Sequence, residues 1–365
     1  YNGKDKAHFG EDDGFKLNVP WGNTISSLRW NHLFNEKLFM KNSIIYSKYD
    51  FNVGMEMAGF EFKLKSVVED FSIKNDFTYL PNIKHNIKFG TNITYHVFRP
   101  ASVSGSSGDV DFSPEEIFKQ YANESALYIS DDYEVTDMLK INLGGRFTTF
   151  QQLDKGYYMY DGKHTQYQNF EPRFSARLKL NTTSSFKTSY SENYQYVHLA
   201  SMGGMSLPTD LWLPSSDIIK PKHAVQYTTG YFKNFENNMF ETSVEVYYKE
   251  MTNLVEYKEG SVPEDNANGS QDQLLTQGDG NSYGVELFLK KVFGNTTGWI
   301  GYTQSFLSTF KLSYVLRVQS SEIKEIRRAG LFFAIEMESA DKVAQVVEKC
   351  LEKGLIGFWF LSTPT

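Results

Sequence analysis

Residues 169–180 and 185–196 both alternate apolar and polar side chains, and this period of two predicts strands with one apolar face. The turn at residues 181–184 joins them into a hairpin. Each strand has about ten residues and the second is rich in tyrosine near its end, as is typical of strands that cross a membrane in a β-barrel. A hairpin of a large soluble β-sandwich has the same pattern, so this hairpin alone leaves both interpretations open.

The pattern recurs along the chain and predicts about twelve strands, an even number, as bacterial barrels prefer. The other five hairpins are expected at 24–34 with 38–49, 62–79 with 85–98, 125–135 with 139–150, 223–233 with 239–249, and 282–293 with 297–306.

The connections favour the barrel, because short turns alternate strictly with long segments. The long segments are 51–61, 99–124, 151–169, 197–222 and 250–281. Outer-membrane barrels have short periplasmic turns and long extracellular loops. We therefore expect a mainly β fold, an antiparallel transmembrane barrel, preceded by a polar loop at residues 1–23. The apolar set Phe174, Ala176, Leu178 and Leu180 is predicted to face lipid.

Composition agrees with half-apolar strands joined by polar loops, since aromatic residues make up 16% of the chain while the mean hydropathy is −0.44. No apolar run is long enough for a transmembrane helix. The net charge of −7 argues against a general nucleic-acid binder. The single cysteine, Cys350, excludes a disulfide framework and a cysteine-based zinc site. The chain begins without Met or signal peptide, so we expect a fragment of a longer protein.

Residues 1–310 contain no nucleophile elbow, phosphate loop or catalytic dyad, so we predict neither an enzyme nor a bound cofactor or metal. Ligand contact is expected in the long loops instead. Tyr157, Tyr158 and Tyr160 could stack on a sugar or macrocycle, or could pack beneath their own loop. Trp212 lies in a segment, 201–221, that is too apolar for a solvated loop, and we expect this segment to fold over the barrel mouth.

Three segments resemble the TonB-dependent receptors, in the style of the Bacteroidetes members. Residues 170–177 resemble the "PR-S-R" strand of that family, and residues 247–254 resemble a strand that enters a large extracellular loop. Gly284-Val285-Glu286-Leu287, followed by residues 298–302, resembles the family's "G-V-E-L … Y-T" hairpin. The order and spacing of these motifs are more specific than any one of them, and the resemblance covers about residues 1–310.

The resemblance implies an outer-membrane barrel of 22 strands, filled by a plug, that imports a scarce small ligand with energy received through a TonB box. This chain has neither plug nor TonB box, so the resemblance implies a partial barrel whose partners are outer-membrane lipid and a small-molecule ligand. The TonB complex is a partner of the parent protein only. The alternative is a passive pore or surface-binding barrel, closed by pairing of residues 24–34 with residues 297–306.

The period changes after residue 310. Residues 331–337 and 355–361 read as buried strands, and the apolar positions from Ala340 to Leu351 recur at helical spacing. This tail, 323–365, resembles the C-terminal domain of class III aminotransferases of the acetylornithine and ornithine type. The resemblance implies a small α/β fragment joined at residues 311–322. The lysine that holds pyridoxal phosphate in that family lies upstream of the matching segment, so a remnant without catalytic residues is expected, as a third interpretation of function.

Overall fold

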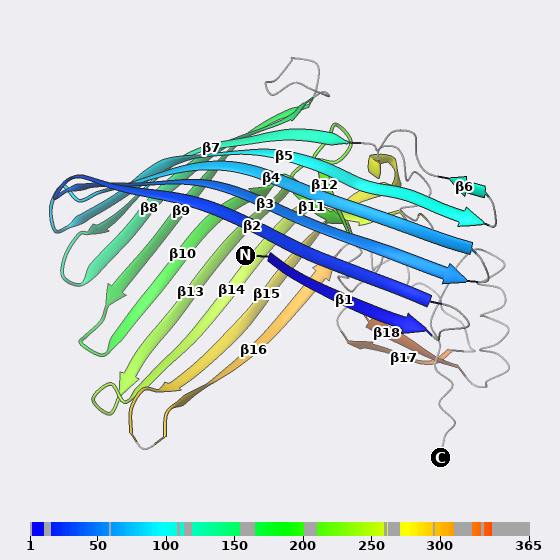
Figure 1. Ribbon diagram of the computed structural model, residues 1–365. Helices are drawn as coiled ribbons and strands as arrows, with labels where there is room; N and C mark the ends of the chain where they lie inside the picture. Colours follow the sequence, from blue (N-terminus) through cyan, green and yellow to red (C-terminus); the bar gives the residue numbers. More distant parts are fainter. Residues whose placement is uncertain are drawn as a thin grey trace.

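The computed structural model describes residues 2–10, 16–57, 60–107, 110–112, 119–153, 165–200, 210–258, 261, 271–294, 296–309, 323–329 and 332–337. Thirteen long strands form one antiparallel sheet in which each strand pairs with the next one along the path (Figure 1). They are β1 Asn2–Gly10, β2 Lys16–Asn35, β3 Leu38–Met57, β4 Phe60–Tyr79, β5 His85–Ser107, β7 Gln120–Glu134, β8 Leu139–Leu153, β9 Gln166–Lys179, β10 Ser184–Gln195, β13 Lys222–Phe235, β14 Phe240–Tyr257, β15 Leu275–Lys291 and β16 Gly298–Thr309.

The predicted antiparallel β fold is confirmed, and each of the twelve predicted strands falls on one of these strands. We call this sheet the wall. Its turn end carries the short connections predicted from the sequence, and its loop end carries the others. Three of the short described strands outside the path lie within residues 1–310: β6 Val110–Phe112, which pairs with β5, and the pair β11 Val197–Ala200 and β12 Leu211–Pro214.

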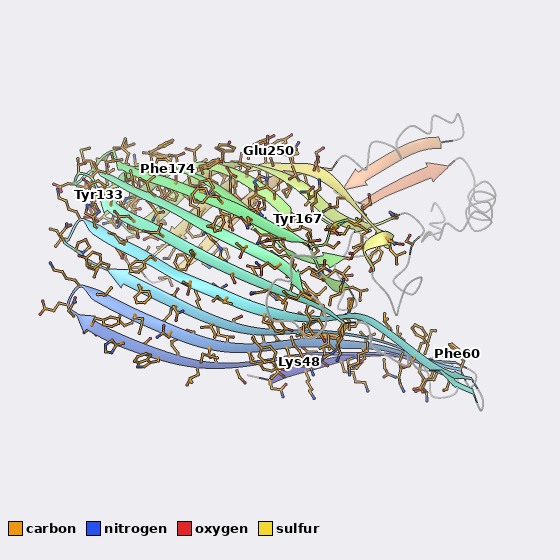
Figure 2. All side chains as sticks on the ribbon, turned by 90° about the horizontal axis from the view of Figure 1, so that it is seen from above. Lys48, Phe60, Tyr133, Tyr167, Phe174 and Glu250 are labelled. Atoms are coloured by element: carbon orange, nitrogen blue, oxygen red, sulfur yellow. The ribbon has the colours of Figure 1, made fainter. Side chains whose placement is uncertain are left out.

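The two faces of the wall differ in polarity, because apolar and polar residues alternate along each strand. Large apolar side chains are exposed on the outer face, among them Leu127, Leu143, Phe174 and Leu178. Neighbours in register are alike, since Leu178 pairs with Phe186 on one side and Leu139 on the other. Figure 2 shows Phe174 and Glu250 on this outer side and Tyr167 on the inner side. The set predicted to face lipid lies on the outer face, which suits a surface covered by hydrocarbon.

Several strands extend further at the loop end than predicted. β3 continues past residue 50 to Met57 and β4 already begins at Phe60, so the expected long connection at 51–61 is wrong: only residues 58 and 59 separate the strands. The strict alternation of short and long connections therefore fails at this one place. The alternation in Phe51, Val53 and Met55 was the missed signal, because it prolongs the strand without any break in period.

The expected loop at residues 1–23 is also wrong, because residues 2–10 form β1 and β2 already begins at Lys16. β1 pairs with β2 from Asn2 opposite Thr24 to Gly10 opposite Lys16. Its charged residues suggested a loop, yet a strand at a sheet edge often carries charge, which discourages pairing with other chains. Hydrogen bonds to β2 decide the conformation here, and they do not require an apolar side chain.

The sheet has two free edges, β1 and β16. β2 is hydrogen-bonded to β3, and to β1 only from Lys16 to Thr24, so residues 25–35 continue the edge that β1 begins; β16 pairs with β15 alone among the described strands. The pairing of residues 24–34 with 297–306 that a self-contained barrel requires is therefore absent from the part of the chain that the structure describes.

The tail forms a sheet of its own, in which β17 Ile323–Ala329 pairs antiparallel with β18 Phe332–Met337. β18 coincides with the strand predicted at 331–337, whereas β17 was not predicted. The expected helix and the second strand, 355–361, lie outside the described residues. Among the described residues, no helix is long and apolar enough to span a membrane.

Candidate functional site at the loop end of the wall

The short strands β11 and β12 form a hairpin that lies inside the curve of the wall at its loop end (Figure 1). We call it the mouth hairpin. β12 contacts β4 and β5, while β11 contacts β14, although five other strands separate β5 from β14 along the sheet. A hairpin with four residues in each strand can reach both sides only across the concave face. It therefore bridges two distant parts of the wall.

An apolar cluster fixes this bridge in place. Leu211 and Leu213 of the mouth hairpin are fully buried, and they belong to the same cluster as Phe51 and Leu64 from one side of the wall and Tyr257 and Leu275 from the other. Burying a leucine side chain contributes roughly 1.5–3 kcal/mol. Burial of these side chains favours a hairpin held against both sides over one that extends into solvent.

Hydrogen bonds hold the segment that follows the hairpin. The hydroxyl of Tyr167 donates to the carbonyl of Ser216 at 2.7 Å. The amide of Lys220 donates to Oε1 of Gln277 at 2.9 Å, and Nε2 of Gln277 donates to the carbonyl of Lys220 at 2.8 Å. Asn253, whose φ is +58°, donates from Nδ2 to the carbonyl of Pro221 at 2.9 Å. The chain thus enters β13 in a single defined path.

His198 is the most enclosed ionisable group of the mouth hairpin, with 0% of its surface exposed. Its Nε2 lies 2.8 Å from Oγ of Ser215, whose hydroxyl donates to the carbonyl of Tyr196 at 3.0 Å. Nε2 must then carry the proton and donate to Ser215. Burial, with a smaller contribution from the Lys222 ammonium, lowers the pKa of His198 to about 3. His198 is therefore neutral at neutral pH and has a structural role.

Trp212 lies on β12 between the two buried leucines, and the described part of its predicted segment, residues 210–221, folds onto the wall. Trp212 is partly buried against a second cluster formed by Phe98, Ala122, Phe150 and Tyr196. The rings of Phe150 and Tyr196 stack at 5.1 Å between centroids. Tyr157, Tyr158 and Tyr160, the other predicted ligand contacts, lie outside the described residues.

The inner face below the hairpin carries a chain of charged side chains that the sequence reading did not single out. Nδ1 of His96 lies 2.7 Å from Asp70, and its Nε2 lies 3.9 Å from Glu124. Arg146 lies 3.6 Å from Glu124 and 3.7 Å from Glu171. These residues come from β4, β5, β7, β8 and β9, one from each strand. The sequence shows that these residues alternate with apolar residues of the outer face. It does not show which strands are neighbours, and so it could not bring the five side chains together.

At the buried end of this row of charged side chains, the carboxylate of Glu171 has a hydrogen-bond partner. Glu171 has only 4% of its surface exposed, and it accepts a hydrogen bond of 2.8 Å from the hydroxyl of Thr148. A buried carboxylate is stable only with such partners. No three His, Cys, Asp or Glu side chains are grouped to hold a metal ion in the described part of the chain. The inner face is thus polar, charged and internally paired.

Comparison with known proteins identifies the same architecture. A family model described as "TonB dependent receptor-like, beta-barrel" matches residues 2–324. No curated protein matches the sequence. Solved structures that resemble the chain include the copper transporter OprC, with a TM-score of 0.57 and 11% identity over 83% of this chain and 52% of that one.

Two further similar structures are also receptors. The pyoverdine outer-membrane receptor FpvA of Pseudomonas aeruginosa PAO1 has a TM-score of 0.54 and 14% identity, covering 81% of this chain and 45% of that one. The ferric preacinetobactin receptor BauA of Acinetobacter baumannii has a TM-score of 0.50 and 12% identity, covering 80% and 46%. The chain spans about half the length of these proteins. At such identities the likeness concerns the fold alone.

Proposed function

This chain belongs to the family of TonB-dependent receptor β-barrels, and on that premise we propose that it forms part of the wall of a receptor that imports a scarce small ligand. The family is one of outer-membrane proteins, so the chain is located in the outer membrane and is not an enzyme. The exposed apolar outer face supports contact with lipid as its main environment.

The mouth hairpin is the observation that carries the proposal of a receptor. A passive pore needs an open lumen, whereas here a hairpin is packed across the concave face at the loop end. The same observation counts against the alternative of a passive pore, as does the missing pairing between β2 and β16. The mouth hairpin lies across the lumen and carries Trp212, so it is suited to bind a ligand that arrives from the loop side.

We propose iron chelates as the first class of ligand to test. FpvA and BauA, which share this fold, are named for pyoverdine and ferric preacinetobactin. Trp212 is the contact proposed on the described surface, and Tyr157, Tyr158 and Tyr160 are proposed contacts in the adjoining loop. Aromatic side chains suit the planar groups of such chelates, because they bury large area with few rotatable bonds.

The test is calorimetric titration of the full chain, refolded in detergent, with a panel of ferric siderophores and ferric citrate. We expect saturable binding of at least one member. Trp212→Phe should preserve the packing of β12 but weaken binding about tenfold, whereas Trp30→Phe, on the outer face, should bind as the parent does. Absence of binding across the panel would remove the chelate proposal, and equal weakening by both substitutions would remove the role of Trp212.

The partners of the parent protein belong to this proposal as well. A plug inside the barrel and energy received from the TonB complex are expected of the whole receptor, of which we propose that this chain is a fragment. The supporting observation is that it spans about half the length of the structures it resembles. The charged inner face is suited to packing against a polar plug.

We further propose that residues 323–365 derive from a class III aminotransferase joined to the receptor at residues 311–322. Two observations support this: the family match ends at residue 324, and β17 and β18 form a sheet separate from the wall. A long sequencing read across codons 300–330 in DNA of the source organism tests it. A receptor gene that continues into further wall strands after codon 310 would show that the tail is an artefact of assembly.

A further inference from the structure

Aromatic side chains form a row across the outer face of the wall. Each of its members has a register partner that also belongs to the row; Tyr227, for example, pairs with Tyr190 on one side and with Tyr248 on the other. We call this row the aromatic belt. It has one member on each wall strand from β3 to β16 except β7: Tyr46, Phe71, Tyr95, Phe147, Phe170, Tyr190, Tyr227, Tyr248, Tyr283 and Phe306.

The members of the belt lie at a common height above the turn end. On seven strands the belt residue is eight positions from the residue at which its strand meets the turn, as Tyr46 is from Leu38 and Tyr248 is from Phe240. Equal distances along strands that share one turn end place the rings at one level. Girdles of aromatic side chains at one level mark the membrane–water interface of transmembrane barrels.

The polarity of the outer face changes across the belt. The outward positions one step towards the turn end are apolar and exposed on five strands: Ile44, Ile73, Ile93, Val246 and Val285. The outward positions one step towards the loop end are polar or charged on five strands: Lys48, Glu69, Gln168, Glu192 and Glu250. A carboxylate or an ammonium in hydrocarbon is costly, so the belt separates a surface suited to lipid from a surface suited to water.

The tyrosine hydroxyls of the belt point to the polar side. Tyr46 donates to Oε1 of Glu69 at 3.4 Å, and Tyr248 donates to Oε1 of Glu250 at 3.1 Å. Tyr190 donates to Glu192 in the same way. Each acceptor lies one step nearer the loop end than the belt. Tyrosine has an apolar ring and a polar tip, so this orientation suits a ring among acyl chains and a hydroxyl among headgroups.

Two strands continue far beyond the belt at the loop end. β3 extends eleven residues past Tyr46 and β4 extends eleven residues past Phe71, whereas β13 extends only five past Tyr227 (Figure 1). With strands tilted by about 40°, eleven residues rise by roughly 28 Å. The outer face of this extension carries Asp50, Asn52, Glu56, Glu61, Lys63 and Lys65.

We propose that the loop-side boundary of the bilayer follows the aromatic belt, and that the extension of β3 and β4 stands in water above it together with the mouth hairpin. The proposal rests on the lipid contact proposed for the outer face and states where that contact ends. The wall residues that hold the mouth hairpin, Phe51, Leu64, Tyr257 and Leu275, all lie on the loop side of the belt. The proposed ligand contact at Trp212 is then reached from water.

The test is spin labelling of single cysteines in the full chain carrying Cys350→Ser, inserted into phosphatidylcholine vesicles. Two matched pairs of sites share a strand and the outer face but lie on opposite sides of the belt. They are Ile44→Cys with Asn52→Cys on β3, and Val246→Cys with Glu250→Cys on β14. Oxygen collides with labels in lipid, and a water-soluble nickel chelate collides with labels in water. We expect oxygen to dominate at positions 44 and 246 and the nickel chelate to dominate at positions 52 and 250.

The outcomes separate the boundary from the lipid contact on which it rests. Dominance of the nickel chelate at positions 44 and 246 would overturn the lipid contact of the outer face, and the boundary with it. Dominance of oxygen at positions 44 and 246 together with position 52 or 250 would overturn the boundary alone. Ligand binding is measured by the separate titration, so its failure would leave the result at these four positions unchanged.

Discussion

The face of the wall on which a residue lies determines whether its side chain is polar or apolar. Glu171 and Leu178 are seven residues apart on one strand, yet the first is buried on a charged inner face and the second is exposed on an apolar outer face. A charge is tolerated on the inner face when a partner is near, as Thr148 is to Glu171.

His198 makes the stability of the mouth hairpin depend on pH. Its pKa is about 3 in the folded hairpin and about 6.5 when the hairpin opens to water. Between these values the open state binds a proton that the folded state does not, so stability is lost as the pH falls from 6.5 towards 3. At pH 5 the loss should be about 2 kcal/mol.

Hydrogen exchange at the amides of β11 and β12, corrected for intrinsic rates at pH 7 and pH 5, measures this loss. His198→Gln keeps a neutral donor and should remove the dependence, whereas His85→Gln, far from the hairpin, should keep it. Equal protection of the parent hairpin at the two pH values would contradict the prediction.

The strands of the wall and the two strands of the mouth hairpin are stabilised in different ways. The wall strands are fixed by hydrogen bonds and by their two-faced pattern, whereas β11 and β12 have only four residues each and depend on apolar contacts with β3, β4, β14 and β15. Loss of one buried side chain should therefore release the hairpin while the wall remains folded.

Leu213→Ala tests this dependence. Truncating a fully buried leucine costs about 2–5 kcal/mol, and the structure gives Leu213 no exposed surface. We expect faster hydrogen exchange at β11 and β12 with unchanged protection of β8 and β9. Global unfolding of the variant at a lower temperature, with no local change beforehand, would show that hairpin and wall form one cooperative unit.

The outer face of β9 is tested by Leu178→Arg. An arginine at mid-bilayer on a lipid-facing strand costs about 2–4 kcal/mol, so insertion into lipid vesicles should fall. Lys179→Arg is the control, because it places an arginine on the same strand but on the inner face. Insertion of Leu178→Arg at the level of the parent would mean that this position does not meet lipid.

The sequence predicted the wall well because alternation is a local signal. It failed where a strand lacked apolar side chains, as in β1, and where a strand continued into an expected loop, as after residue 50. The candidate site was predicted only in part. Trp212 was recognised by its apolar neighbours, but its partners Phe98 and Phe150 lie more than 60 residues away. Which strands such a hairpin contacts depends on the curvature of the sheet, and no local pattern encodes that.

The wall is a curved sheet whose two edges are unpaired among the described residues, and these edges should dominate the behaviour of the chain in isolation. Trp299 and Ile300 of β16 each have 71% of their surface exposed. Unpaired edge strands readily pair with other chains. In detergent, the purified chain should therefore associate further as its concentration rises, measured by light scattering during size-exclusion chromatography. Ile300→Lys should reduce the association, and a parent chain that stays monomeric at all concentrations would contradict this expectation.

Strand direction along the wall has a consequence for closure. The path from β1 to β16 comprises thirteen strands, and all twelve steps between neighbours are antiparallel. After an even number of reversals, β1 and β16 point the same way. A ring whose members alternate in direction has an even number of members, as a ring of alternating colours does. Any antiparallel barrel that contains this wall therefore needs an odd number of further strands, whichever chain supplies them.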